Sequence, residues 1–175
     1  MKTIKIFFDE PKPFEMGIIK PLDGILGLYF IFLSQNEIHY PFNQSRLIYI
    51  GMSEKRTNSI GKRLSDHFDG KSGNPGLINY RKVDPLFFTY INFEMLKKIW
   101  QLRIEDLESY FILDFVKHYG VYPICNNKSG FEILKNDLTI NLEIDWPYFA
   151  KEKNGTLDTL DTLDTLDMLN DTVTK

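Results

Sequence analysis

The sequence contains little cysteine and no segment typical of export or membrane insertion. Cys125 is the single cysteine among 175 residues, so an internal disulfide cannot form. No cluster of cysteine and histidine has zinc-binding spacing, so we expect no structural metal. No apolar run is long enough to cross a bilayer, and residues 1–5 lack the apolar stretch of a signal peptide. We therefore expect a cytoplasmic protein with no membrane contact, stabilised by packing alone.

Aromatic residues are absent beyond Phe149, although they make up 14% of the chain, and 43% of all residues are hydrophobic. The length and the apolar content suit one compact domain and are too small for an enzyme with a separate cofactor domain. From residue 156 the tripeptide Thr-Leu-Asp repeats. A leucine at every third residue advances by about 300° on a helix and forms no apolar stripe. We expect 154–175 to be a low-complexity, flexible tail.

The net charge of −3 conceals an uneven distribution of charge. Five aspartates and one lysine lie in 156–175, so residues 1–155 carry a net charge of +1. Within 54–82, seven lysine and arginine residues face three acidic residues. Such a stretch is compatible with phosphate binding and equally with an ordinary solvated surface. The basic residues that we select as candidates for nucleic-acid binding are Lys55, Lys62, Lys71, Arg81 and Lys82.

The hydrophobic pattern predicts an α+β protein with a small antiparallel sheet of three strands flanked by helices. Residues 27–33 are apolar on both alternating faces, which is typical of a central strand covered on both sides. Residues 46–51 are expected to form a hairpin with this strand. The other expected elements are a first strand at 2–8, a helix from a cap at Asn58 or Ser59 to about residue 68, an irregular loop at 70–86, a third strand at 86–93, a helix broken at most once at 94–119, and a late edge strand at 138–144.

Glu108 is the most informative single position. On a helix its side chain points within about 60° of four apolar residues and therefore lies inside an apolar stripe. These residues are Ile104, Phe111, Ile112 and Phe115. An ionised carboxylate in such a stripe needs a compensating group. An ion pair with an arginine such as Arg63, a stripe end that opens to water and a bound metal ion all satisfy this need.

Two further groups of residues suggest chemistry. Arg63 and His67 are four residues apart and project from one side of the same predicted helix. A guanidinium group suits a phosphate, and an imidazole can accept or donate a proton near neutral pH. Tyr29 and Tyr49 lie in the two predicted hairpin strands. Taken alone, each of these residues is better explained by packing or by surface exposure.

Taken together, these residues resemble the GIY-YIG nuclease family. The ordered set consists of Gly27-Leu28-Tyr29, Tyr49-Ile50-Gly51, Arg63, His67, Glu108 and Asn126, and it spans about 24–130. The resemblance implies the GIY-YIG endonuclease fold, with a catalytic domain at 24–135. It leaves a strand and extension at 1–23 and a strand and cap at 136–153, where extra edge strands are possible. The first motif has Leu28 in place of isoleucine, and the connection between the motifs, with a loop at 35–44, is longer than usual.

The resemblance also implies an activity and roles for the site residues. The activity is hydrolysis of phosphodiester bonds in DNA by an endonuclease with a single divalent metal ion, Mg²⁺ or Mn²⁺. Glu108 would hold the metal, Arg63 would bind the scissile phosphate, and Asn126 or its neighbour Asn127 would be the family's asparagine. Tyr29 would be the base, provided that a nearby cation favours its phenolate, with His67 as the alternative. Tyr49 would match the tyrosine of the second motif.

The alternative hypothesis is a nucleic-acid-binding module with the same fold and no activity. The target, the biological role and the choice between monomer and homodimer are not indicated by the sequence.

Overall fold

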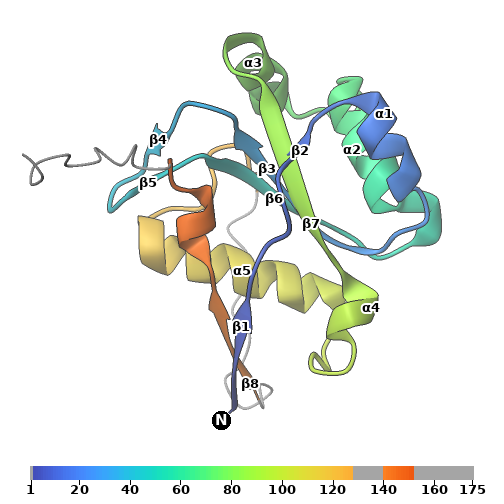
Figure 1. Cartoon of the computed structure of the whole chain (residues 1–175), viewed down its shortest axis with the longest axis vertical. Helices are drawn as coiled ribbons and strands as arrows, with labels where there is room; N and C mark the ends of the chain where they lie inside the picture. Colours follow the sequence, from blue (N-terminus) through green and yellow to red (C-terminus); the bar gives the residue numbers. More distant parts are fainter. Residues whose placement is uncertain (1, 128–139, 152–175) are drawn as a thin grey trace, which may run out of the picture.

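The computed structural model describes residues 2–127 and 140–151, which form an α+β structure around a four-stranded antiparallel sheet (Figure 1). The strand order is β2 (Lys12–Pro13), β7 (Leu86–Asn92), β3 (Gly27–Leu33) and β6 (Leu47–Ser53). The three long strands match the predicted sheet, and β2 adds two residues at one edge. The predicted tail at 154–175 lies outside the described residues.

Strand β3 forms the centre of the molecule and is buried along its whole length. Leu28, Phe30 and Phe32 contribute to one apolar cluster, whereas Tyr29, Ile31 and Leu33 contribute to a second cluster. Because successive side chains of a strand point to opposite faces, the two clusters cover the two faces of the sheet. The prediction of a central strand covered on both sides is confirmed.

Helix α2 (Ile60–Phe68) packs on the face that carries Tyr29, next to α1 (Met16–Ile19) and the short helix η1 (Lys20–Leu22). The helix begins where predicted, because the Ser59 side chain accepts a hydrogen bond from the backbone N–H of Lys62 at 3.3 Å. Another short helix, η2 (Arg56–Asn58), connects β6 to it.

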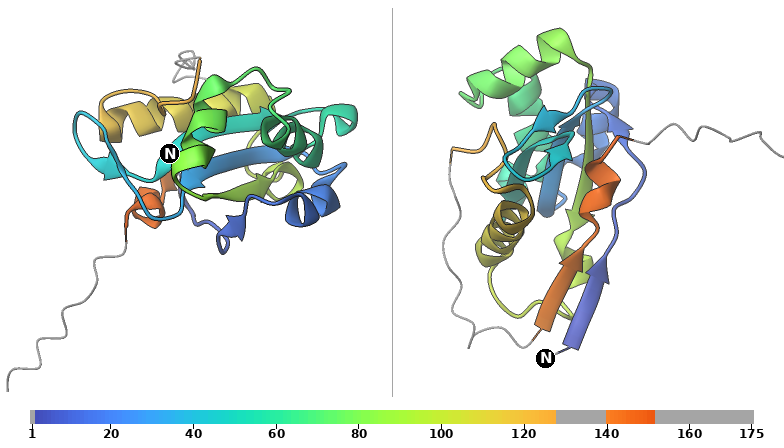
Figure 2. Two further views of the ribbon diagram at one scale, coloured as in Figure 1. Left: turned by 90° about the horizontal axis from the view of Figure 1, so that it is seen from above. Right: turned by 90° about the vertical axis from the view of Figure 1, so that its left-hand side faces the viewer.

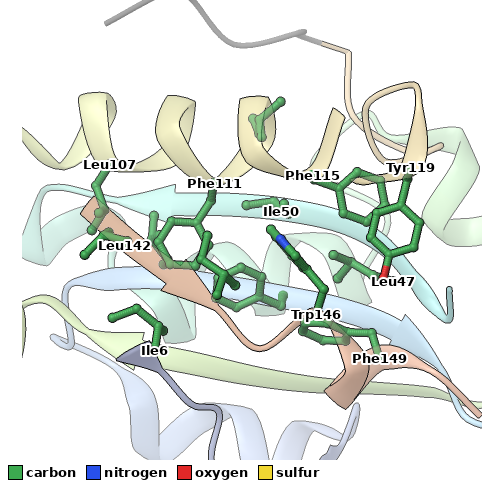
Figure 3. Packing of buried hydrophobic residues seen from close by; sticks show 14 of the residues in the cluster. Ile6, Leu47, Ile50, Leu107, Phe111, Phe115, Tyr119, Leu142, Trp146 and Phe149 are labelled. Carbon is green, nitrogen blue, oxygen red and sulfur yellow. The ribbon is translucent and has the colours of Figure 1, made fainter. Parts of the chain in front are cut away.

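Helix α5 (Ile104–Tyr119) covers the opposite face (Figure 3). The predicted long helix is broken once, between α4 (Phe93–Leu96) and α5. Helix α5 is capped at its C-terminal end by Gly120, whose φ of 90° lies in the left-handed region that favours glycine.

The sequence leaves extra edge strands possible at both ends of the domain, and only β2 of the N-terminal extension joins the central sheet, whereas β1 (Lys2–Ile6) and β8 (Ile140–Ile144) form a separate sheet. Strand β1 pairs in parallel with β8, and Figure 2 shows the two strands side by side. Leu142, together with the helix η4 (Trp146–Phe149), packs against the apolar side of α5. In this position Ile6, Leu142 and Ile144 are buried in the same apolar cluster as α5.

Residues 75–83 form a helix, so the prediction of an irregular loop at 70–86 is wrong. Helix α3 (Pro75–Val83) has a proline in its first turn, where a missing N–H is tolerated. The Asn74 side chain caps it by accepting a hydrogen bond from Leu77 N at 3.3 Å.

The long connection between β3 and β6 has local order of its own. It contains a short hairpin of β4 (Ile38–His39) and β5 (Gln44–Ser45). The buried carboxylate of Asp84 accepts hydrogen bonds from Ser34, Gln35 and Asn36 and fixes the start of this connection. Within the described ranges 2–127 and 140–151, no helix combines the length and the apolar character needed to span a bilayer.

Candidate active site

A pocket of about 350 Å³ lies beside strand β6, and most of the predicted catalytic residues line it. We refer to it as the β6 pocket. The predicted residues on its wall are Tyr49, Arg63, His67, Glu108, Asn126 and Asn127. Residues far apart in the sequence thus share one small volume, as the ordered motif set predicted.

The position of β6 explains how these residues meet. Among the described residues β6 pairs only with β3, so its other side is an edge of the sheet. Helix α2, which carries Arg63 and His67, covers one face of the sheet, and α5, which carries Glu108, covers the other. Side chains from the two faces can therefore converge around this edge, where Tyr49 of β6 joins them.

Tyr29 lies behind the pocket wall. Its side chain is completely buried, and it is connected to the pocket through two of the lining residues. The Nε–H group of Arg63 donates to Tyr29 Oη at 3.4 Å, and Tyr29 Oη lies 3.1 Å from His67 Nε2. His67 Nδ1 in turn lies 2.7 Å from Ser72 Oγ. The ring of Tyr49 packs edge-on against His67, with 5.0 Å between the ring centroids.

Burial sets the protonation of these groups. Burial raises the pKa of Tyr29 well above its ordinary value and outweighs the opposing effect of Arg63. Burial also raises the pKa of Tyr49. The pKa of His67 is lowered to about 4, first by burial and then by the charge of Arg63. Both tyrosines are therefore neutral phenols and His67 is a neutral imidazole at pH 7. Arg63 lowers the pKa of Tyr29 as expected, but this effect is smaller than that of burial, so Arg63 alone does not favour the phenolate.

Glu108 lies where the sequence pattern predicted. Its neighbours in the stripe are buried, with Ile104 at 5% and Phe111 at 0% exposure, whereas Glu108 is half-buried and lines the β6 pocket. The apolar stripe of α5 thus reaches the pocket at this carboxylate.

The donor set suits a metal ion that keeps most of its water. In the described ranges, no group of three or more His, Cys, Asp or Glu side chains is arranged to hold a metal ion. A zinc centre with three or four protein ligands needs such a group. Mg²⁺ commonly binds through one or two carboxylates, water and substrate phosphate. Glu108 fits this second type of site.

Close steric contacts explain why glycine occupies positions 27 and 51 in the two motifs. A Cβ atom on Gly51 would lie 2.5 Å from Tyr29 Cζ and Oη and 2.7 Å from Tyr49 Cε1. A Cβ atom on Gly27 would lie 1.9 Å from the carbonyl oxygen of Ile91, on the neighbouring strand. Both distances are far below normal contact, so only glycine allows these strands and tyrosine rings to approach each other so closely.

Asn126 connects the segment 123–127 to the edge of β6. Its Oδ1 accepts from Ile50 N at 3.0 Å, and its Nδ2 donates to Ile50 O at 2.8 Å. Cys125 N also donates to the carbonyl of Ile48 at 2.9 Å. The amide of Asn126 thus satisfies backbone groups that an edge strand leaves open. Asn127 is exposed and lines the same pocket.

The predicted nucleic-acid-binding residues are all exposed, and none of these five lines the β6 pocket. Ion pairs join Lys62 to Asp66, Lys71 to Asp69 at 2.7 Å, and Lys55 to Glu54 at 3.8 Å. Arg81 donates to the carbonyl of Phe68 at 2.8 Å, with its guanidinium 4.2 Å from the Phe68 ring. Arg81 and Lys82 lie beside a second pocket of about 260 Å³, which shares His67 with the first.

Four polar residues of the β6 pocket were missed by the sequence analysis: Glu54, Asn58, Ser72 and Asn74. Asn74 precedes a proline and caps α3, and this pattern could have revealed it. Its side chain also donates to the carbonyl of Cys125 at 2.8 Å. No local signal identifies Ser72, because its position depends on the turn between two helices.

Comparison with models of known protein families gives no match, and neither the curated proteins nor the solved structures contain a significant match to this chain.

Proposed function

We propose that this chain is a divalent-metal-dependent DNA endonuclease with a single-metal active site of the GIY-YIG type, in a domain with the corresponding fold. The observation that carries the proposal is the shared pocket of Tyr49, Arg63, His67, Glu108 and Asn126, with Tyr29 hydrogen-bonded directly behind it. These residues were selected as one motif set, and packing alone does not require them to meet at one edge of a sheet.

Arg63 is the group that binds the scissile phosphate. It lies partly exposed on the pocket wall, and its Nε–H is used by Tyr29. The two terminal amino groups of a guanidinium can donate to two nonbridging oxygens of a phosphate. Arg63 can therefore orient Tyr29 and stabilise charge on the transition state at the same time.

His67 Nε2 is the final acceptor of the proton from the attacking water. One route passes through Tyr29, which gives its proton to His67 as it takes one from water; in the other route His67 accepts the proton directly. The complete burial of Tyr29 and its raised pKa favour the direct route, because His67 itself lines the pocket. A phosphate bound to Arg63 offsets the positive charge that lowers the pKa of His67 and so makes the imidazole a better base.

Glu108 would hold the metal ion, Mg²⁺ or Mn²⁺. When bound, the ion would supply positive charge that stabilises the departing 3′ oxygen. Asn126 supports this site by holding the backbone of Ile50, which lies between Tyr49 and Gly51 in the second motif.

DNA binding outside the pocket depends on the exposed cations. Arg81 and Lys82 of α3 lie beside the second pocket, which adjoins the first at His67. Contacts of such residues with the phosphate backbone position a duplex without reading its sequence. The 35–44 connection and the turn before α3 are the segments available for recognition.

A plasmid-nicking assay tests the proposal. The full chain should convert supercoiled plasmid to nicked or linear DNA with Mg²⁺ or Mn²⁺, and not with EDTA. Glu108→Gln should abolish this conversion while DNA binding remains, because the amide keeps the shape and removes the charge that holds the cation.

Glu105→Gln is the matched control, since Glu105 lies on the same helix and pairs with Arg103 at 3.3 Å, away from the pocket lining. Full activity of Glu108→Gln would exclude the metal assignment. A wild-type chain that binds DNA and cuts none with either ion would instead be the inactive binding module.

A further inference from the structure

Ser72 belongs to a turn that returns the chain to the end of α2. The turn contains Gly70 with φ of 75° and Gly73 with φ of 69°, both in the left-handed region that favours glycine. The Ser72 backbone N–H donates to the carbonyl of Asp66 at 3.0 Å. The turn therefore holds the Ser72 hydroxyl 2.7 Å from His67 Nδ1, at the wall of the β6 pocket.

Arg63 fixes the direction of the first hydrogen bond along this chain of groups. A guanidinium can only donate, so Tyr29 Oη accepts the bond from Arg63 Nε. The phenolic hydrogen is then free to point at His67 Nε2, 3.1 Å away. A neutral imidazole that accepts at Nε2 carries its hydrogen on Nδ1. With this tautomer, Ser72 Oγ accepts the hydrogen bond from that nitrogen, 2.7 Å away.

We propose that Ser72 is a positioning residue that holds His67 as the Nδ1–H tautomer, leaving Nε2 unprotonated and ready to accept a proton by either route. The catalytic consequence rests on the proposed function, whereas the tautomer is a property of the folded chain alone. Fixing the tautomer of a base through its other ring nitrogen is an established way to keep the reactive nitrogen unprotonated. Without the Ser72 hydroxyl, only solvent water could bond to His67 Nδ1, and the turn does not hold that water in place.

Nuclear magnetic resonance of the ¹⁵N-labelled full chain tests the tautomer at pH 7. His67 should show a pyrrole-type Nδ1 and a pyridine-type Nε2 resonance, assigned by their loss in His67→Gln. Ser72→Ala should shift the Nδ1 resonance and make the two tautomers exchange, and Ser72→Thr should restore the wild-type pattern. Ser65→Ala removes a hydroxyl from the same helix as His67 and should leave the pattern unchanged. His39 and His118 serve as internal controls.

Nicking rates measured on the same variants test the catalytic role. Ser72→Ala should lower the rate about 3- to 10-fold, as for loss of one hydrogen bond, and Ser72→Thr should recover most of it. A pyridine-type Nδ1 in the wild type, or unchanged resonances and rate in Ser72→Ala, would overturn the proposal. If the wild type cuts no DNA, the proposed function fails, and the resonances alone decide whether Ser72 holds the tautomer.

Discussion

Among single residues, His67 is a titratable group whose pKa folding lowers to about 4, mainly by burial. Its side chain is 4% exposed and contacts Tyr29, Tyr49 and Ser72, while Arg63 lowers its pKa and Asp66 opposes this effect. A neutral ring in this position can accept a proton only if the surrounding charge changes. Under the proposed function, an anionic substrate bound beside Arg63 would provide such a change.

Folding stability should therefore fall as the pH is lowered. The pKa of His67 is about 4 in the folded protein and 6.5 in the unfolded chain, so between these values the unfolded state binds a proton that the folded state does not. This penalty fades as the pH rises above 6.5, and the contribution of His67 to the free energy of unfolding should fall by about 2 kcal/mol from pH 7 to pH 5. Urea unfolding of the wild type and of His67→Gln at both pH values measures the difference. An equal loss in the two proteins would contradict the assignment.

Replacing Arg63 tests the phosphate contact. Arg63→Ala should lower the nicking rate by about 10²-fold or more, since one electrostatic stabiliser of the transition state is removed. Arg56→Ala removes an exposed arginine from the neighbouring helix η2 and should leave the rate unchanged. Thermal unfolding of both variants identifies any loss that comes from misfolding. Wild-type rates in a folded Arg63→Ala protein would exclude this role.

The sequence was sufficient to predict the location of some of these side chains, but not how deeply others are buried. The position of Glu108 followed from helical periodicity, because that periodicity is a local property. The depth of Tyr29 could not be predicted, since it depends on how α2 and Gly51 pack over it. The direction of its pKa shift depends on that burial, so the expected phenolate could not be judged from residue types.

Among the elements of the structure, the segment 123–127 has the clearest influence on the site. It joins β6 through Asn126 and Cys125, and Asn74 ties it to the start of α3. This short segment thus connects two elements beside the pocket, β6 and α3. Its contacts explain how an edge strand can carry site residues and keep a fixed position.

Removing the Asn126 side chain should loosen this connection. Asn126→Ala leaves the N–H and C=O of Ile50 without their partner, which should lower the free energy of unfolding by about 1–3 kcal/mol and reduce nicking. Asn127→Ala, at an exposed position, should change stability by less than about 0.5 kcal/mol. Denaturant unfolding of both variants measures this contrast. A larger effect of Asn127→Ala would assign the asparagine role to Asn127.

The errors in predicting helices and strands from the sequence have physical causes. Proline and glycine in 70–86 suggested an irregular loop, yet Pro75 is compatible with the first turn of a helix. The terminal strands were recognised from their alternation, but alternation does not specify a pairing partner. Pairing of β1 with β8 depends on α5 offering an apolar surface, which lies far away in the sequence.

For the whole molecule, the distribution of charge matters more than its sum. The net charge is −3, while 54–82 carries an excess of cations, several of them paired with neighbouring acids. Phosphate binding by such residues releases counterions from DNA. The excess of cations thus belongs to one segment of the sequence.

DNA affinity should accordingly fall steeply with salt. If all five predicted cations contact phosphates, the slope of log affinity against log salt should approach about −4.5. Arg81→Ala or Lys82→Ala should each reduce the magnitude of the slope by about one, and Lys98→Ala, at an exposed position on the chain after α4, should not. Fluorescence anisotropy over a salt series measures the slopes. A salt-insensitive complex would exclude binding through these cations.

The parallel pairing of β1 with β8 also has a mechanical consequence. Five residue pairs, from Lys2 with Ile140 to Ile6 with Ile144, lie in register. A force that pulls on Lys2 and on Ile144 draws the strands past each other along their length. All of their hydrogen bonds then carry the load together and do not open one after another. The pair therefore acts as a shear clamp that resists extension of the chain before the sheet behind it is strained.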